Sequence, residues 1–404
     1  MARRTGGERA LTTAGRSRLG LYLHVPFCAA LCRYCTFTRS VTDTGLERRY
    51  VSALAREIRA GLPPAAPEAG PPPAADTIYF GGGTPSLLDP TDIAALIRVC
   101  RDVFDVDADA EITLEANPET VTPDRLAGYR AAGVNRLSLG VQSFVDAELA
   151  RLGRLHDQAR ARLAFDAARR AGFDNVSLDL MLGLPGQSLA DLRVSVGALA
   201  DLAPEHASVY LLEIYPQSPL AGEMARHHWA RVSDDEMADM YLETMASLEA
   251  AGYEQYEISN LARTGRRSRH NLKYWTDGAW AGFGCGAHST VGDERWNNVS
   301  SVPEYLAQVE EGRPPVAGRR HRTARERVEE AMFMGLRLTG GVSLARIRAD
   351  YGVDVVARWG SRLEEFEEAG LVEGDQQRLR LTRRGMLLAN DVMSAFLEAG
   401  STVK

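Results

Sequence analysis

The sequence predicts an α/β fold: a barrel or partial barrel of parallel strands, followed by a small second unit of helices and a hairpin. Between residues 21 and 251, short apolar runs alternate six times with amphipathic segments. Repeated strand–helix alternation produces a parallel sheet with right-handed crossovers, and six such units favour a closed or partly closed barrel. After residue 321 the pattern changes to helical segments and two short strands.

The expected strands are short and rich in apolar residues, as buried parallel strands are. Binding and catalytic residues should then lie at their C-terminal ends, where the loops of a barrel meet. The strands are predicted at Leu21–Val25, Thr77–Phe80, Glu111–Glu115, Arg136–Gly140, Ser177–Met181 and Ala207–Glu213.

The segments between these strands have helical periodicity, and several begin at a polar cap and end near a glycine. They are predicted at Glu47–Ala60, Thr91–Phe104, Pro123–Ala132, Gln158–Ala171, Ser188–Leu202 and Asp234–Ala251. The Pro/Ala-rich stretch Gly61–Asp76 predicts a surface loop, and the Pro/Gly/Arg-rich stretch Gly312–His321 predicts a domain linker.

The C-terminal pattern resembles a winged-helix module. Three helical segments precede a predicted hairpin at Leu371–Thr382, and a last helix is expected near Gly385–Phe396; the three are Arg325–Leu338, Leu344–Tyr351 and Val355–Ala369. Some winged helices bind DNA, but the chain carries a net charge of −7. Because nucleic-acid binding favours a basic face, we expect no nucleic-acid partner.

The N-terminal residues 1–19 are rich in Arg, Gly and Thr and lack the apolar core of a secretory signal. They predict a disordered tail. No apolar run in the chain reaches the length of a membrane span. We therefore expect a cytoplasmic protein.

Three of the five cysteines, Cys28, Cys32 and Cys35, lie within eight residues directly after the first predicted strand. In a reducing compartment such a group favours metal binding over disulfides. Three thiolates on one loop can each bind a different iron of a cubane cluster and leave the fourth iron open, which predicts a [4Fe–4S] cluster. A zinc site would need a fourth ligand, for which His24 is the nearest candidate.

The Cys-x-x-x-Cys-x-x-Cys spacing after a first barrel strand resembles the signature of the radical S-adenosylmethionine (SAM) superfamily. The segment Tyr22–Cys28 resembles the start of the cluster loop in HemN/HemW proteins, and Gly81–Pro85 resembles their glycine motif. The resemblance implies a radical SAM partial (β/α)6 TIM-like barrel at residues 20–255 and a HemN-type extension with a linker at residues 256–320. It also implies a winged-helix-like domain at residues 321–404.

The same resemblance implies a SAM site. A carboxylate in an apolar strand needs a partner, which Glu115 and Asp179 would find in ribose hydroxyls, and an arginine suits the SAM carboxylate. The residues implied to bind SAM are Tyr22, Tyr34, Gly82, Gly83, Thr84, Glu115, Gln142, Arg154 and Asp179.

Two features distinguish branches of this family. The porphyrinogen dehydrogenases carry a further cysteine two positions after the third, where this chain has Phe37. The segment His270-Asn271-Leu-Lys-Tyr274-Trp275 resembles the His-Asn-x-x-Tyr-Trp motif of the HemW branch, which the family associates with heme. An imidazole can ligate heme iron, and Tyr and Trp can pack on a porphyrin. Alternatively, the four side chains are structural, with His270 and Asn271 bonding a loop and the aromatic pair filling core.

The resemblance implies a heme chaperone that binds heme, a [4Fe–4S] cluster and SAM. It would deliver heme to acceptors such as respiratory proteins, including those at the membrane, and a homodimer is compatible with it. Two alternatives remain open: an oxygen-independent coproporphyrinogen III dehydrogenase and a HemN-like radical SAM methyltransferase. Whether the chain catalyses a reaction is left open.

Overall fold

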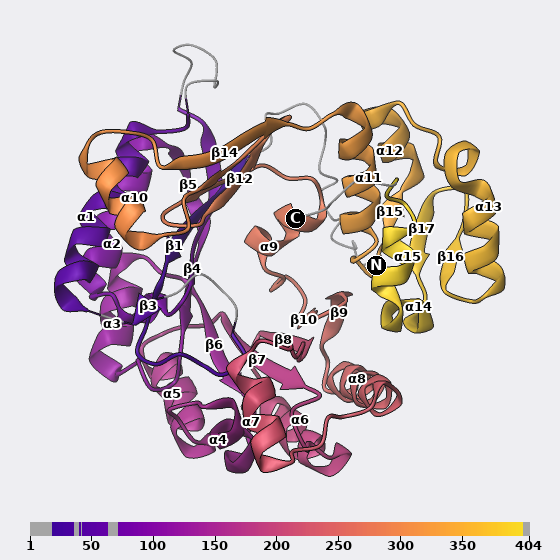
Figure 1. Cartoon of the computed structure of the whole chain (residues 1–404), viewed down its shortest axis with the longest axis horizontal. Coiled ribbons are helices and arrows are strands. Elements are labelled where there is room, and N and C mark those ends of the chain that lie inside the picture. Colours follow the sequence, from indigo (N-terminus) through magenta and orange to yellow (C-terminus); the bar gives the residue numbers. More distant parts are fainter. Residues whose placement is uncertain (1–17, 36–39, 42, 64–71, 399–404) are drawn as a thin grey trace, which may run out of the picture.

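A 12-stranded mixed sheet runs through the larger part of the molecule, and a small helical unit lies at its side (Figure 1). The computed structural model describes residues 18–35, 40–41, 43–63 and 72–398. Residues 1–17 of the expected tail, Phe37 and residues 64–71 of the expected surface loop therefore lie outside the described residues. The first strand begins at Leu19.

Six neighbouring parallel strands form the curved centre of this sheet, which confirms the predicted α/β partial barrel. Alternate side chains of each strand point outward and are apolar, as Leu21 and Leu23 illustrate. These outward residues pack under the helices and form the main core. The strands are β1 (Leu19–Val25), β4 (Ala74–Gly82), β5 (Asp105–Ala116), β6 (Arg136–Gln142), β7 (Val176–Leu182) and β8 (His206–Leu211).

Helices cover the outer face of the barrel (Figure 1). Their starts carry the expected polar caps; the Ser188 hydroxyl, for example, accepts a hydrogen bond from the Asp191 amide in a capping box. The helices are α1 (Thr44–Ala60), α2 (Pro90–Val103), α3 (Pro123–Ala132), α4 (Asp146–Leu152), α5 (Gln158–Arg170), α6 (Leu189–Leu202), α7 (Pro219–His227) and α8 (Asp234–Ala250). The short α4 and α7 are not among the helices predicted from the sequence.

Residues 254–321 extend both edges of the barrel sheet. At one edge β10 (Asn260–Ala262) joins β8 and pairs with β9 (Glu254–Glu257). At the other edge β11 (Trp280–Phe283) runs parallel to β1 and is followed by antiparallel strands. The remaining elements are β12 (His288–Val291), β13 (Glu294–Asn298), β14 (Val316–His321), α9 (Arg269–Trp275) and α10 (Val302–Glu310).

The prediction of a linker at residues 312–321 was wrong for its second half. Residues Val316–His321 form β14, which pairs antiparallel with β13. The charged composition of this segment indicated a linker because β14 is an edge strand whose Arg and His side chains are mostly exposed.

The C-terminal unit contains a three-stranded sheet, ordered β15-β17-β16, against helices with their own apolar core. The helix expected near residues 385–396 is divided into α14 (Arg383–Leu387) and α15 (Ala389–Ser394). The other elements are α11 (Ala324–Gly335), α12 (Leu344–Tyr351), α13 (Val355–Glu368), β15 (Val342–Ser343), β16 (Val372–Gly374) and β17 (Arg378–Leu381).

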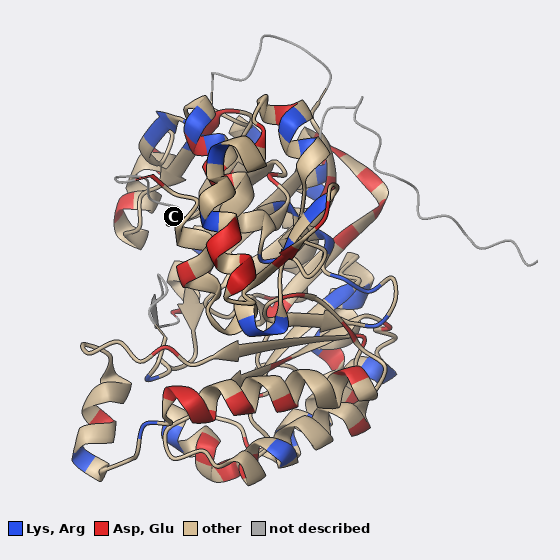
Figure 2. Cartoon of the chain, turned by 90° about the vertical axis from the view of Figure 1, so that its right-hand side faces the viewer, with Lys and Arg blue, Asp and Glu red and all other residues tan. Residues whose placement is uncertain are grey.

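Charged residues of both signs are distributed over the upper and lower parts of the face in Figure 2, in keeping with the mild net charge. Among the described residues, no helix combines the length and apolarity needed to cross a lipid bilayer.

Candidate functional site

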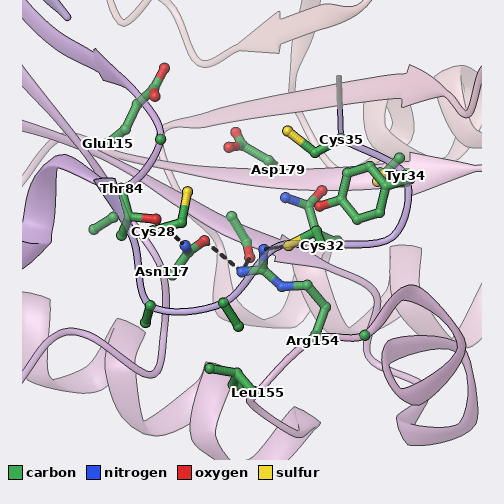
Figure 3. Close-up of a pocket in the computed structure, with 18 of the residues that line it drawn as sticks. Cys28, Cys32, Tyr34, Cys35, Thr84, Glu115, Asn117, Arg154, Leu155 and Asp179 are labelled. Carbon is green, nitrogen blue, oxygen red and sulfur yellow. Dashed lines mark hydrogen bonds between the residues drawn. The ribbon is translucent and has the colours of Figure 1, made fainter. Parts of the chain in front are cut away.

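A cavity of about 540 Å³ opens at the C-terminal ends of the barrel strands (Figure 3). It is lined by the three clustered cysteines and by every residue predicted to bind SAM except Tyr22. Tyr22 also points into the barrel, but below the cavity, where its hydroxyl lies 3.1 Å from Nδ1 of His24. Parallel strands bring these residues together because their carboxyl ends share one rim.

The cysteines lie on the loop that follows β1. Cys28 ends the two-residue strand β2 (Phe27–Cys28), which pairs with β3 (Ser40–Val41). Cys32 and Cys35 lie further along the loop, where the Cys35 amide donates to the Cys32 carbonyl at 3.4 Å. Arg33 anchors this loop, since its amide donates to the Leu152 carbonyl at 3.3 Å.

Among the described residues, no group of three or more His, Cys, Asp and Glu side chains is close enough to hold a single metal ion. In a cubane cluster each thiolate would bind a different iron, so such a cluster does not need the three sulfurs to hold one ion.

A glycine turn after β4 lies against the cysteine loop. Gly82 has φ +120°, a conformation that L side chains rarely adopt. A Cβ atom on Gly83 would lie 2.5 Å from the carbonyl oxygen of Phe27 and 3.0 Å from Sγ of Cys28. Only a residue without a side chain therefore allows the turn and the cysteine loop to approach this closely.

Two carboxyl groups face the cavity from β5 and β7. Burial raises the pKa of Glu115 to about 7, although the Tyr79 hydroxyl donates to Oε1 at 2.8 Å and the Gly82 amide to Oε2 at 3.1 Å. Burial likewise raises the pKa of Asp179 to about 6, against a hydrogen bond of 3.1 Å from the Ser138 hydroxyl. Both groups therefore change charge close to neutral pH.

Arg154 lies between the cysteine loop and the strand ends, with its side chain only 3% exposed. It donates to Oδ1 of Asn117 at 2.5 Å, to the Gly140 carbonyl at 2.9 Å and to Sγ of Cys32 at 3.4 Å. These contacts tie the cysteine loop to the ends of β5 and β6.

Sequence reasoning missed Asn117, which connects two predicted residues. Its amide nitrogen donates to Oγ1 of Thr84 at 3.0 Å, while its oxygen accepts from Arg154 (Figure 3). Asn117 stands two positions after Glu115, where β5 has just ended, so strand position was the available signal.

The cavity fits the cofactors that the sequence predicts. The Gln142 side-chain oxygen and the Arg154 Nε are buried and have no hydrogen-bond partner among the described residues. Gln142 has φ +70°, a strained conformation at the end of β6 that tends to mark functional positions. Buried polar atoms need partners, so these two groups suit a polar ligand beside the cysteine loop.

The predicted heme residues lie on α9, toward the opposite end of the barrel. His270 is 1% exposed; its Nδ1 lies 2.8 Å from Oγ1 of Thr77 and its Nε2 lies 2.9 Å from the Tyr274 hydroxyl. Burial lowers the pKa of His270 to about 3, so the ring is neutral. Asn271 is partly exposed, and its backbone N–H donates a hydrogen bond of 3.4 Å to the hydroxyl of the N-cap residue Ser268.

Trp275 ends α9 and faces the C-terminal unit. The guanidinium of Arg337 lies 4.4 Å from the centre of the Trp275 ring. The Trp275 indole N–H is buried, and no acceptor for it lies in the part of the chain that the structure describes. The described arrangement therefore engages all four motif residues in packing or hydrogen bonds within the protein.

Two known protein families match parts of this chain. The Radical SAM superfamily matches residues 22–198, and the HemN C-terminal domain matches residues 323–388. The "Heme chaperone HemW" of Bacillus subtilis is 38% identical over 377 residues, which cover 93% of this chain and 98% of that protein. The chain belongs to the HemW family. A second HemW, from Mycobacterium tuberculosis, is 39% identical over 94% of each chain.

This chain shares its fold with the coproporphyrinogen III oxidase HemN. The solved structure of HemN from Escherichia coli, described as a radical SAM enzyme, superposes with a TM-score of 0.81 at 26% identity. The superposition covers 94% of this chain and 90% of the HemN chain. Membership of the radical SAM superfamily implies a [4Fe–4S] cluster and SAM as cofactors.

Proposed function

We propose that this protein is a heme chaperone that holds a [4Fe–4S] cluster and SAM in the cavity at the strand ends, binds heme, and passes heme to an acceptor. The observation that carries this proposal is the HemW relationship over almost the whole chain, combined with the cysteine-lined cavity. We take three further expectations from the family: a cytoplasmic location, respiratory proteins as heme acceptors, including those at the membrane, and a homodimer.

In the cofactor site, Cys28, Cys32 and Cys35 would hold the cluster. When bound, a cluster of this kind would supply one-electron chemistry to SAM. The chain's own groups would position the cofactor: Gly82 and Gly83 allow close backbone approach, and Thr84 and Tyr34 line the same cavity.

The remaining SAM residues would bind the polar parts of the cofactor. Glu115 and Asp179 offer acceptors for hydroxyl groups once ionised, and Gln142 offers its unpartnered oxygen. Arg154 holds the cysteine loop against the strand ends, because its contacts reach Cys32, and its free Nε suits a carboxylate.

For heme, the geometry gives the motif residues different roles. In the described arrangement His270 orients the Tyr274 hydroxyl, and both of its ring nitrogens are engaged. An iron–His270 bond therefore requires His270 to leave Thr77 or Tyr274. Asn271, Tyr274 and Trp275 are each partly exposed and can meet a heme face or edge without such a movement.

The test compares heme handling with porphyrinogen chemistry. After anaerobic reconstitution, the protein should bind heme in a visible-absorption titration and transfer it to apo-myoglobin used as a probe acceptor. It should not convert coproporphyrinogen III when SAM and reductant are supplied. Robust conversion would overturn the proposal in favour of the dehydrogenase alternative, to which the HemN fold gives weight.

A triple change of His270, Tyr274 and Trp275 to Ala should impair heme binding or transfer while leaving the iron content unchanged. Because that variant removes buried side chains, Tyr274→Phe serves as a milder second variant. The matched control is the double change of His227 and Trp229 to Ala, since these rings also stack, at 5.1 Å, but lie at the end of α7. Unchanged heme binding in both motif variants would remove the motif from the proposed heme site.

A further inference from the structure

The interior of the barrel is polar, whereas barrels are usually filled by branched apolar side chains. Inward positions alternate along each strand and carry Thr77 and Tyr79 on β4, and Glu111 and Glu115 on β5. Arg136, 1% exposed, faces inward from β6. Buried polar groups of this kind form networks in which one group restrains the next.

One side chain in this interior touches both ends of the barrel. The Tyr79 hydroxyl donates to Oε1 of Glu115, which lines the cavity, at 2.8 Å. The ring of the same residue stacks on His270 of α9, with 5.0 Å between ring centres and 30° between planes. Tyr79 is only 8% exposed, so its ring has little room to turn.

The helix α9 depends on these contacts for its position. It has only seven residues, too few for a helix that persists by itself. Its first turn is held by Glu111, whose carboxylate accepts from the amides of Arg269 at 3.0 Å and His270 at 3.1 Å. Thr77, two positions before Tyr79, holds the His270 ring at 2.8 Å. The position of α9 therefore depends on side chains of β4 and β5.

We propose that Tyr79 is a positioning residue that couples the cavity at the strand ends to α9. A ligand that immobilises Glu115 also immobilises the group that accepts the hydrogen bond of the Tyr79 hydroxyl. Tyr79 then restrains the stacked His270 ring, and His270 restrains Tyr274 through their hydrogen bond. This inference rests on the proposed SAM site, because SAM is the ligand expected at Glu115. The two sites then influence each other's affinity by the same factor.

The direction of the coupling follows from His270. Its two nitrogens are engaged in the described arrangement, so it offers none to iron until α9 loosens. SAM holds α9 in place and therefore disfavours the arrangement in which His270 ligates heme. Bound SAM should thus weaken heme binding and promote heme release.

The test follows hydrogen exchange of the α9 amides in the cluster-reconstituted chain, with and without SAM, so that it does not depend on heme. In the wild type, SAM should slow exchange over residues 269–275 by about five-fold or more. Tyr79→Phe keeps the stacked ring and removes only the hydroxyl. In this variant SAM should slow the exchange of residues 269–275 by less than about two-fold. The SAM Kd of each protein is measured in parallel by equilibrium dialysis.

The matched control is Thr113→Val. Thr113 lies on β5 between Glu111 and Glu115, and its buried hydroxyl has no hydrogen-bond partner within residues 18–35, 40–41, 43–63 and 72–398, so its removal should leave the SAM effect as in the wild type. Equal slowing in Tyr79→Phe and wild type, or SAM binding with no slowing in the wild type, would overturn the coupling. Failure to bind SAM would refute the proposed SAM site and the coupling with it.

A heme titration gives the second readout. SAM should raise the heme Kd by about the factor seen in exchange, and Tyr79→Phe should abolish that increase. A lower heme Kd with SAM would contradict the proposed direction. Absence of heme binding would refute the heme proposal, while the exchange result would still decide whether Tyr79 couples the cavity to α9.

Discussion

Gly83→Ala is the substitution that most directly probes the contact between the glycine turn and the cysteine loop. The added Cβ would lie 2.5 Å from the Phe27 carbonyl oxygen, whereas real Cβ atoms essentially never come closer than 3.0 Å to such an atom. The loop must therefore retreat by about half an ångström. Because Phe27 precedes Cys28 directly, this shift moves a proposed cluster ligand.

The size of the effect can be worked from this overlap. Overpacking against backbone costs about 1–3 kcal/mol. At about 1.4 kcal/mol for each factor of ten, this disfavours the closed loop by roughly 5- to 150-fold. Functional groups must also stay within about 0.5 Å of their productive positions, which is the size of the forced shift. We expect a lower iron content and a SAM Kd raised about five-fold or more.

The assay is anaerobic reconstitution followed by iron and sulfide determination, visible absorption and SAM titration. Thermal unfolding of the apo proteins checks that the fold is retained. Gly197→Ala is the matched control, because it lies within α6 with no atom within 4 Å of the added Cβ, and it should be neutral or stabilising by about 0.5–1 kcal/mol. Wild-type iron content and SAM Kd in Gly83→Ala would refute the reasoning.

Three further predictions concern the same cavity. Cys32→Ala should abolish the absorption of the cluster. Cys100→Ala should keep it, because burial raises the pKa of the Cys100 thiol to about 12. Retained absorption in Cys32→Ala would refute the cluster assignment. SAM should bind about ten-fold or more tightly at about pH 8 than at about pH 5.5. The pKa values of Glu115, raised to about 7, and Asp179, raised to about 6, mean that both carboxyl groups lose their protons over this range and then attract the cationic cofactor. A flat profile of the SAM Kd against pH would contradict this. Arg154→Lys should raise the SAM Kd about ten-fold, because an ammonium cannot reproduce the forked contacts of the guanidinium, and an unchanged Kd in dialysis would argue against that role.

The sequence alone determined the central architecture and the composition of the cavity. The barrel strands were predictable because buried parallel strands are continuous apolar runs, and the helices between them carry local caps. The cysteines and the glycine turn were predictable because each acts through spacing within one loop. Their gathering at one rim follows from the topology, since successive parallel strands end on the same side.

Only the tertiary structure decided which groups meet across the chain. Asn117 connects Thr84 to Arg154 over 33 and 37 positions, and no local pattern encodes such a pairing. The sequence left open whether His270 is a heme ligand or a structural residue; in the structure, Oγ1 of Thr77, 193 positions earlier, lies 2.8 Å from its Nδ1. The same hydrogen-bonding chemistry suits a ligand and a buried network alike, so burial, which depends on the whole fold, determines the state in which His270 is held.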